Sequence, residues 1–341
     1  MVGINPVGIK DVAREAGVSV GTVSNVLNRP DKVTPAVREQ VEATIRRLGY
    51  VRNESARQLR AGSSRTIALV VLDVANPFFA DVISGAEEAA EDVGALVVVA
   101  NSAGDPGREA RHLARLEAQQ VMGVLLSPVR TQTSEEVDGI DLRSTPVVLV
   151  DRGTASSRAP SVAVDDVRGG ELAGAHLRAR GHTSIAFVGG PEHLAQVRDR
   201  LAGLRLAAHG GARVEVLTVP DLSIRAGSAA AAQLFATWPG REGRPTAVFC
   251  ANDLLALGVL NECIRRGVRV PDDLAIVGYD DISFAGTAAV PLTSVRQPRE
   301  QLGRTAVELL LETVADPGGG RRRHVLFTPD LVERESSRRT G

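Results

Sequence analysis

Long apolar runs and cysteines are scarce in this 341-residue sequence. No stretch reaches the roughly 18 uninterrupted apolar residues that a membrane-spanning helix requires, so we predict no membrane segment. The N-terminal region has no basic segment followed by an apolar run, so we expect no secretory signal peptide. The two cysteines, Cys250 and Cys263, stand in apolar patterns, which excludes a disulfide framework. These absences together predict a cytoplasmic protein.

The sequence also lacks the common signatures of catalysis and metal binding. The motifs GxxxxGKS/T, GxSxG and HExxH are absent, and the six histidines are scattered without ligand spacing. The two cysteines are thirteen residues apart and have no histidine near them, which does not make a zinc site. We therefore predict that the protein is not an enzyme and uses no metal and no cofactor.

The charges of the chain are unevenly distributed, although its net charge is only −1. Residues 1–62 hold ten basic and six acidic residues, a balance of +4, whereas the remainder carries −5. This distribution favours a polyanionic partner for residues 1–62 but not for the remainder of the chain. The total length predicts two or three domains.

Residues 9–28 have the pattern of two short helices joined by a tight turn. Gly17 can adopt the left-handed conformation that ends a helix, and Ser19 is a good N-cap for the next one. Apolar residues at helical spacing give the two helices faces that can pack together: Val12, Ala13, Ala16, Val23, Val26 and Leu27. An ordinary helical hairpin has the same pattern, so the segments that follow have to decide between the two interpretations.

The outer face of the second helix carries short side chains near its N-terminus. Such a helix can enter the major groove closely, where its polar groups reach base edges. Asn25 has the amide that can pair bidentately with adenine. We predict that Val20, Gly21 and Asn25 face bases, while Thr22 and Ser24 hold phosphates. The predicted DNA-contacting set in this helix is Ser19, Val20, Gly21, Thr22, Ser24 and Asn25.

Two further segments extend this pattern. Thr34 and Pro35 open a third helix that ends at Gly49, and its apolar face completes a three-helix domain over residues 1–50. Asn53 can cap a helix of about two turns, which is marginal in water unless something packs against it. Residues 51–63 are therefore predicted to form a hinge helix and linker. A solvated linker with Leu59 against a neighbouring domain is the alternative.

From residue 64 onward, apolar runs alternate with helical stretches. Continuous Val, Ile and Leu runs suit strands of a parallel sheet that are buried on both faces. The predicted strands are 67–72, 95–100, 123–126, 146–150, 185–188, 214–219, 247–250 and 274–277, and helices are expected at 78–93, 108–119, 168–180 and 254–266. A crossing near 160–166 and a return near 296 predict a two-lobed, doubly wound α/β domain over residues 64–341 with a cleft between its lobes.

Polar residues follow several of these strands. Ligands of doubly wound lobes bind at the carboxyl ends of the strands, so these side chains are candidates for a ligand that carries many hydroxyls. They are Asp73, Asn101, Ser127, Asp151, Asn252 and Asp280. Arg200 could add a bidentate grip on adjacent hydroxyls. Asp and Asn also end strands and cap helices, so Asp73 and Asn101 stay open between a ligand role and a structural one.

Residues 9–28, residues 50–62 and the later strand-end motifs together resemble the lactose-repressor family of bacterial transcription regulators. The likeness covers essentially the whole chain in the same order. It implies a periplasmic-binding-protein-like fold for the lobes, with three crossovers between them. It also implies a hinge helix that folds on operator DNA, with DNA contacts at Asn53, Ala56 and Leu59. In the family a leucine at the place of Leu59 wedges into the minor groove and bends the duplex.

The resemblance also assigns effector contacts. Four stretches match those of sugar-binding members, which places effector contacts at Asp151, Arg200, Asn252 and Asp280, with Phe79 as an aromatic wall. Leu222 departs from the stacking aromatic that is common in the family, and aromatic residues make up only 3% of the chain. Two further departures are Gly8, where a Thr cap is frequent, and Arg52, where a Pro is frequent.

We therefore predict a transcriptional regulator, in particular a repressor, that binds a palindromic operator as a homodimer and is controlled by a small-molecule effector of the sugar class. Residues 333–341 contain no leucine heptads, so we expect no coiled-coil tetramer. A transport-type solute-binding protein and a sugar-modifying enzyme on a Rossmann-like scaffold are the alternatives. The three-helix domain over residues 1–50 argues against a solute-binding protein. The missing nucleophile, metal and phosphate motifs argue against an enzyme.

Overall fold

The computed structural model describes residues 7–50, 64–129, 145–152, 159–238, 242–316 and 323–338. Two compact units emerge, residues 1–63 and residues 64–341. The predicted hinge residues Asn53, Ala56 and Leu59, together with Arg52, lie outside the described residues. The hinge helix and its DNA contacts therefore stay predictions.

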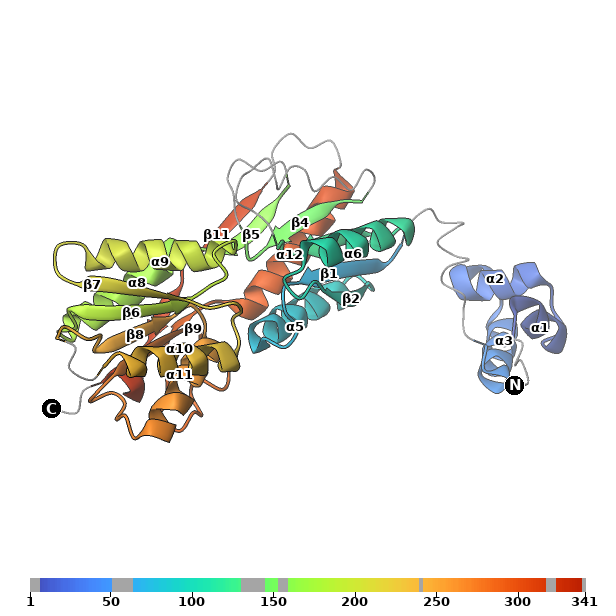
Figure 1. The fold of residues 1–341 in the computed structure, drawn as a ribbon. Coiled ribbons are helices and arrows are strands. Elements are labelled where there is room, and N and C mark those ends of the chain that lie inside the picture. The colour runs from blue at the N-terminus through green and yellow to red at the C-terminus, as the bar shows by residue number, and fades with distance from the viewer. Residues whose placement is uncertain are drawn as a thin grey trace. The chain divides into compact units, whose positions relative to one another are not determined.

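The described part of the first unit, residues 7–50, folds into helices joined by short turns (Figure 1). α1 spans Ile9–Glu15, α2 Val20–Asn28, η1 Pro30–Lys32 and α3 Pro35–Leu48. The predicted core is confirmed, because Val12 on α1, Val23 on α2 and Val41 on α3 are completely buried and belong to one cluster. Burial of these side chains stabilises a unit that is otherwise near the lower size limit for independent folding.

The turn between α1 and α2 has the predicted chemistry. Gly17 has a φ of +62°, and the Ser19 hydroxyl accepts the backbone N–H of Thr22 at 3.0 Å. Gly8 supplies no side-chain cap to α1. Instead, the Asp11 carboxylate accepts the Gly8 N–H at 3.0 Å, and this hydrogen bond lowers the pKa of Asp11. One half of a capping box thus remains at the start of α1.

The second unit contains two sheets, each of which forms the centre of a lobe. Lobe 1 has the order β11-β5-β4-β3-β1-β2, and lobe 2 has the order β12-β10-β9-β8-β6-β7. All pairs are parallel except β10 with β12. The lobe 1 strands are β1 (Thr66–Val71), β2 (Leu96–Asn101), β3 (Gly123–Leu126), β4 (Val147–Val150), β5 (Ser161–Val164) and β11 (His324–Phe327). The lobe 2 strands are β6 (Ser184–Gly189), β7 (Arg213–Thr218), β8 (Ala247–Cys250), β9 (Ala275–Asp280), β10 (Thr293–Arg296) and β12 (Asp330–Val332).

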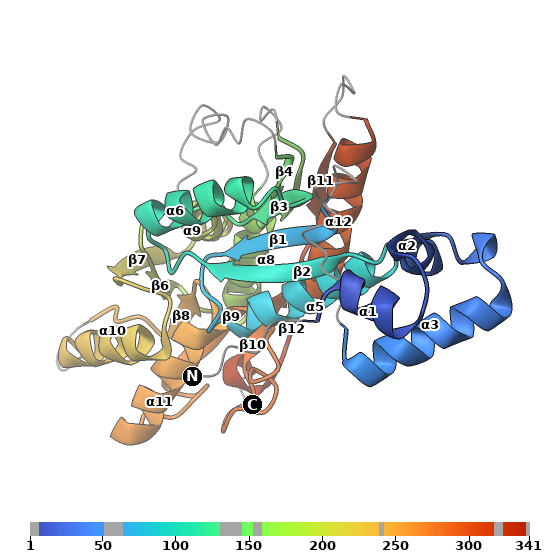
Figure 2. The ribbon, with the colours of Figure 1, turned by 90° about the vertical axis from the view of Figure 1, so that its right-hand side faces the viewer.

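Helices cover both faces of each sheet. In lobe 1, α6 (Pro106–Ala118) lies on one face, and α5 (Pro77–Glu91) and α12 (Arg299–Ala315) lie on the other (Figure 2). In lobe 2, α8 (Asp166–Ala179) pairs with α9 (Ala195–Ala208), and α10 (Ile224–Ala236) pairs with α11 (Asp253–Arg266). A short 3-10 turn, η2 (Glu335–Ser337), lies near the end of the described chain. Of the helices in the described ranges, none has the length and hydropathy to cross a membrane.

The predicted two-lobed fold is confirmed, and the chain passes between the lobes three times. It enters lobe 2 after β5, returns to lobe 1 after β10, and reaches lobe 2 again between β11 and β12. All eight predicted strands are present. β5, β10, β11 and β12 were not predicted as strands, because these short segments at the crossings lack a long apolar run.

Two glycines bring α8 and α9 unusually close together. A Cβ at Gly170 on α8 would lie 2.1 Å from the carbonyl oxygen of Arg200, and a Cβ at Gly203 on α9 would lie 1.9 Å from that of Val167. Any larger residue would push the helices apart. Because Arg200 lies on α9, the close packing of α8 against α9 determines where Arg200 stands relative to the sheet of lobe 2.

Candidate functional site

The outer face of α2 is available to a partner. Ser19, Val20, Gly21 and Asn25 are exposed, with Val20 at 41%, while Thr22 and Ser24 are half-buried. The side-chain amide of Asn25 makes no hydrogen bond to any described residue. Its nitrogen can therefore donate to a partner, and its oxygen can accept from one. The Ser24 hydroxyl accepts the Asn28 amide at 3.2 Å, which directs that side chain along the helix. The arrangement suits a base-reading role for Asn25.

A cavity of about 370 Å³ lies between the two lobes. All six predicted effector residues line it: Phe79, Asp151, Arg200, Leu222, Asn252 and Asp280. The carboxyl ends of β1 and β4 supply the lobe 1 side, and the ends of β8 and β9 together with α9 supply the lobe 2 side. Residues far apart in the sequence are thus brought together where the two sheets face each other.

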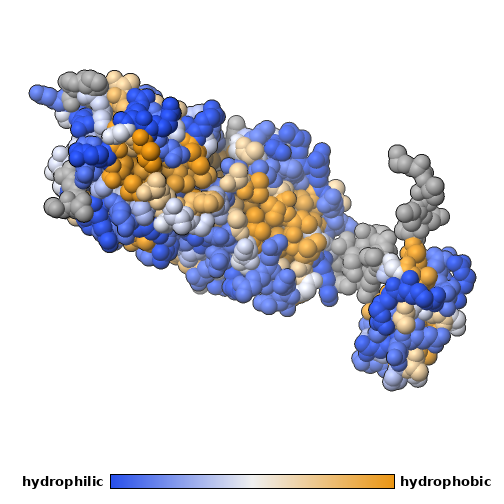
Figure 3. Space-filling model, turned by 90° about the horizontal axis from the view of Figure 1, so that it is seen from below, coloured by the Kyte–Doolittle hydropathy of each residue, from blue (hydrophilic) through white to orange (hydrophobic). Residues whose placement is uncertain are grey.

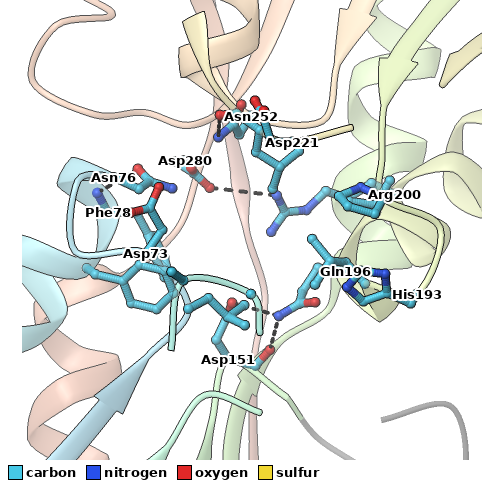
Figure 4. A pocket seen from close by; sticks show the side chains of 18 of the residues that line it. Asp73, Asn76, Phe78, Asp151, His193, Gln196, Arg200, Asp221, Asn252 and Asp280 are labelled. Atoms are coloured by element: carbon cyan, nitrogen blue, oxygen red, sulfur yellow. Dashed lines mark hydrogen bonds and ion pairs between the residues drawn. The ribbon is translucent and has the colours of Figure 1, made fainter. Parts of the chain in front are cut away.

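Arg200 reaches into this cavity from α9. Its Nε donates to Asp166 at 2.8 Å, its Nη1 donates to the carbonyl oxygen of Ala251 at 2.7 Å, and Nη1 lies 3.8 Å from Asp280. Its Cζ also lies 3.7 Å from the ring centroid of Tyr279. Figure 4 shows the guanidinium between Asp280 and Gln196, with its other amino group toward the open space. Arg200 is therefore held rigidly and presents one edge to a ligand.

Asp151 follows β4 and faces α9 across the cavity. The Gln196 amide donates to its Oδ2 at 2.9 Å and to its backbone oxygen at 3.0 Å (Figure 4). Oδ1 is buried and has no partner among the described residues. Burial, followed by the nearby Asp166 carboxylate, raises the pKa of Asp151 to about 7. Oδ1 is an acceptor that a ligand hydroxyl could use.

Asp280 ends β9 and lies opposite Arg200. Its Oδ1 accepts the Gln297 amide at 2.7 Å. Burial raises the pKa of Asp280 to about 6, against the lowering effects of Arg200 and of this hydrogen bond. Asp280 and Asp151 have φ angles of +103° and +59°, in the region that strains side-chain-bearing residues. Backbone strain of this kind concentrates at functional sites.

Asn252 has a structural role in addition to lining the cavity. Its Oδ1 accepts the Leu255 N–H at 2.9 Å and so caps α11, and its amide nitrogen donates to the Leu222 carbonyl at 3.2 Å. Leu222 is half-buried at the cavity wall, as expected for an apolar contact without stacking. An effector contact by the remaining Asn252 donor stays a prediction.

The other strand-end residues differ in their position relative to the cavity. Asp73 lines the cavity, whereas Asn101 and Ser127 do not. The Asn101 side chain accepts the Ala103 N–H at 3.0 Å and shapes a turn. Ser127 is completely buried.

Several lining residues were missed by the sequence analysis. They are Leu72, Asn76, Phe78, Ala103, Gly104, His193, Leu194, Gln196, Val197, Pro220, Asp221 and Gln297. Asn76 and Phe78 stand beside Phe79, so that short motif could have identified them. His193 precedes α9, and Gln196 lies in the first turn of that helix. Neither residue directly follows a predicted strand, so the strand-end pattern could not identify them. Gln297 lies at a crossing between the lobes, which only the assembled fold places at the cavity.

Comparisons with known proteins agree with this architecture. Residues 8–53 match the family described as bacterial regulatory proteins, lacI family, and residues 175–337 match a periplasmic binding protein-like domain. The HTH-type transcriptional repressor PurR of Photobacterium profundum is 35% identical over 335 residues, which cover 96% of this chain and 98% of that protein.

Two solved structures are also similar. The lac repressor dimer bound to operator and the anti-inducer ONPF has a TM-score of 0.83 and 30% identity, covering 98% of this chain and 99% of that chain. The transcriptional regulator CelR in complex with cellobiose has a TM-score of 0.70 and 33% identity, covering 97% and 99%.

A helix-turn-helix unit joined in one chain to two lobes with a polar cavity defines a DNA-binding regulator of the ligand-controlled class. The chain belongs to the lacI family of bacterial regulatory proteins.

Proposed function

We propose that this protein is a cytoplasmic, non-enzymatic repressor that binds a palindromic operator and changes its DNA affinity when a sugar-class effector fills the interlobe cavity. The observation that carries the proposal is the convergence of Asp151, Arg200, Asn252 and Asp280 on one cavity, in a chain that also presents α2. In this proposal residues 1–50 form the DNA-binding domain, residues 51–63 form the hinge, and residues 64–341 form the domain that binds the effector and dimerises.

The decisive experiment is an electrophoretic mobility shift of the full chain with genomic fragments. A repressor of this kind selects a few fragments that contain inverted repeats, and its affinity for them changes when a cell extract supplies the effector. Uniform binding to all fragments, or no binding, would refute the proposal. Sequencing the selected fragments would show which genes the protein controls.

Asn25→Ala is expected to weaken binding to the selected operator by about 1–3 kcal/mol, because a bidentate contact to adenine is lost. Binding to random DNA should change little, since phosphate contacts carry that affinity. Fluorescence anisotropy with both duplexes measures the difference. Equal losses on the two duplexes would remove Asn25 from the base-reading residues.

A sugar-class effector suits the chemistry of the cavity. The lining combines carboxylate and amide oxygens with amide and guanidinium donors, and a hydroxyl group can pair with both kinds. Phe78 and Phe79, whose rings meet edge to face at 5.0 Å, supply an apolar surface for the C–H faces of a sugar ring. The cellobiose complex of the similar regulator CelR supports the same ligand class.

Control of DNA binding requires that the effector bind two arrangements of the lobes unequally. Asp151 belongs to lobe 1, whereas Arg200, Asn252 and Asp280 belong to lobe 2, so a ligand that contacts both sides favours a closed arrangement. Closure changes the spacing of the lobes and thereby of the segments that join them to the DNA-binding units. A coupling of about 1–3 kcal/mol gives a 5- to 150-fold response.

We also propose a homodimer, because one helix-turn-helix unit reads only half of a palindrome. Apolar residues form patches on the surface of both lobes from the side shown in Figure 3. β2 is an edge strand that exposes Leu96 at 63% and Val99 at 42%, and Phe284 in lobe 2 is exposed at 55%. Exposed apolar edges are uncommon in monomers, so these residues are candidates for the interface.

Light scattering at micromolar concentration should therefore give twice the chain mass of 35.9 kDa. Leu96→Lys should shift the protein toward monomer and lower its affinity for the full palindrome. A matched lysine at Ile264, which is exposed at 53% on α11, tests whether any exposed apolar residue has the same effect. A tetramer for the unmodified chain would contradict the proposal.

A further inference from the structure

We propose that Arg299 is a positioning residue for the interlobe cavity: from lobe 1 it holds Asp280, which belongs to lobe 2, in place. Where it concerns the effector response, this inference rests on the proposed function, because Asp280 is a proposed effector contact. Asp280 lines the cavity, whereas Arg299 does not. Arg299 acts through Asp280 and through the corner that the chain makes directly after β9.

The corner after β9 has a strained backbone. Asp280 and the next residue, Asp281, have φ angles of +103° and +52°, and both carry a Cβ. Backbone of this kind persists only where the surrounding structure holds it. Lobe 2 holds the N–H groups, because the Ser294 hydroxyl accepts the Asp281 N–H at 3.0 Å and the Asp253 carboxylate accepts the Ile282 N–H at 2.9 Å. The carbonyl groups of the corner need other partners.

Arg299 binds the carbonyl groups of the corner. Its Nη1 donates to the carbonyl oxygen of Asp280 and to that of Asp281, the second at 2.7 Å. Successive carbonyl groups of a regular strand point to opposite sides, so one donor reaches both only because the corner turns them to the same side. Hydrogen bonds from one charged group to both oxygens therefore favour the strained conformation. That conformation sets the direction in which the Asp280 side chain leaves the backbone.

The other end of this contact is anchored in lobe 1. Arg299 Nε donates to the Asp81 carboxylate on α5 at 2.6 Å. α5 and α12 lie side by side (Figure 2), and a Cβ at Gly85 on α5 would lie 1.9 Å from the carbonyl oxygen of Glu300, the residue after Arg299. This close packing leaves the start of α12 little freedom to move relative to α5. One guanidinium thus joins a rigid part of lobe 1 to the cavity side of lobe 2.

Helix formation does not explain an arginine at this position. Arg299 is the first residue of α12, where the positive end of the helix dipole disfavours a cation. Its side chain is only 18% exposed, so most of the solvent that would stabilise the charge is excluded. The contacts with Asp81 and with the two carbonyl oxygens offset these costs. Contact across the lobe boundary therefore accounts for this residue.

Hydrogen exchange of the full-length protein tests whether Arg299 holds the corner, and it needs no effector. Arg299→Met should speed exchange of the Asp281 and Ile282 amides by about tenfold or more, because the corner opens more often when its carbonyl groups are released. Arg304→Met is the matched control, because Arg304 also joins α12 to α5, through Glu88 at 2.5 Å, within lobe 1. Unchanged exchange in Arg299→Met, or equal acceleration in both variants, would overturn the proposal.

Asp81→Asn tests the anchor in lobe 1 with a milder change. Asparagine keeps an oxygen for Arg299 Nε but removes the charge. The amides of Asp281 and Ile282 should therefore exchange faster than in the unmodified protein and more slowly than in Arg299→Met. Circular dichroism confirms that each variant is folded. Exchange at the rate of the unmodified protein would overturn the anchoring by Asp81.

A mobility shift titrated with the cell extract that supplies the effector tests the consequence for control. Arg299→Met should raise the midpoint of the extract-dependent change by about tenfold, because a displaced Asp280 loses part of its charge-assisted hydrogen bonds to ligand hydroxyls. Operator affinity without extract should stay unchanged. In a protein that already carries Asp280→Asn, Arg299→Met should raise the midpoint by less than about threefold, because both changes act on the same contact. Full additivity of the two changes would overturn the role of Arg299 in positioning Asp280.

The two measurements separate this inference from the proposed function. An unmodified protein that binds its operator but does not respond to the extract would refute effector control, while the exchange rates would still decide whether Arg299 holds the corner. Faster exchange in Arg299→Met together with a normal response to the extract would leave the proposed function intact and would overturn the positioning role.

Discussion

Asp280→Asn is expected to keep operator binding and to weaken the response to effector by about 10- to 150-fold. The cause is the loss of charge-assisted hydrogen bonds from ligand hydroxyls, each of which contributes about 1.5–3 kcal/mol at a buried site. Asn can still accept the Gln297 amide and tolerates the φ of +103° better than alanine does. Replacement by asparagine therefore isolates the charge from the fold.

A mobility shift titrated with the active extract measures this effect. The midpoint of the effector-dependent change in operator binding should move to much higher extract concentration, while the affinity without extract stays unchanged. Asp272→Asn is the matched control, because Asp272 lies 3.8 Å from Arg269, away from the cavity. If Asp280→Asn retained the midpoint of the unmodified protein, the assignment of the cavity as the effector site would be wrong.

Arg200→Met is expected to lower the free energy of unfolding of the two-lobed unit by about 3–5 kcal/mol, because it leaves a buried carboxylate without its partner. Burial by itself would lower the pKa of Arg200, but Asp166, Asp280 and other neighbouring groups raise it above its ordinary value. Arg200 thus stabilises lobe 2 in addition to its proposed contact with the ligand.

Urea unfolding followed by circular dichroism measures the loss. The double variant Arg200→Met with Asp166→Leu should recover part of the lost stability, because an apolar pair replaces a broken ion pair. A single variant as stable as the unmodified protein would show that the Arg200–Asp166 pair makes no net contribution. Loss of effector response is interpretable only at temperatures where the variant is fully folded.

The sequence by itself determined the elements whose pattern is local. Helical spacing, Gly17 and Ser19 specified the helix-turn-helix, because caps and turns depend on neighbouring residues. The apolar runs specified eight strands, since buried parallel strands need continuous apolar side chains. Asp151 and Asp280 could be selected because strand ends in such sheets converge on the ligand site. Family resemblance then separated them from other strand-end residues.

Only the tertiary structure decided how these residues act. Sequence reasoning treated Arg200 as a free grip on hydroxyls, but Asp166, 34 positions away, binds its Nε. Gln196 and Gln297 carry no local signal and reach the cavity through a helix end and a crossing between lobes. The physical reason is that burial and charge compensation depend on groups brought together by sheet and helix packing, and their separation along the chain has no fixed period that a sequence pattern could reveal.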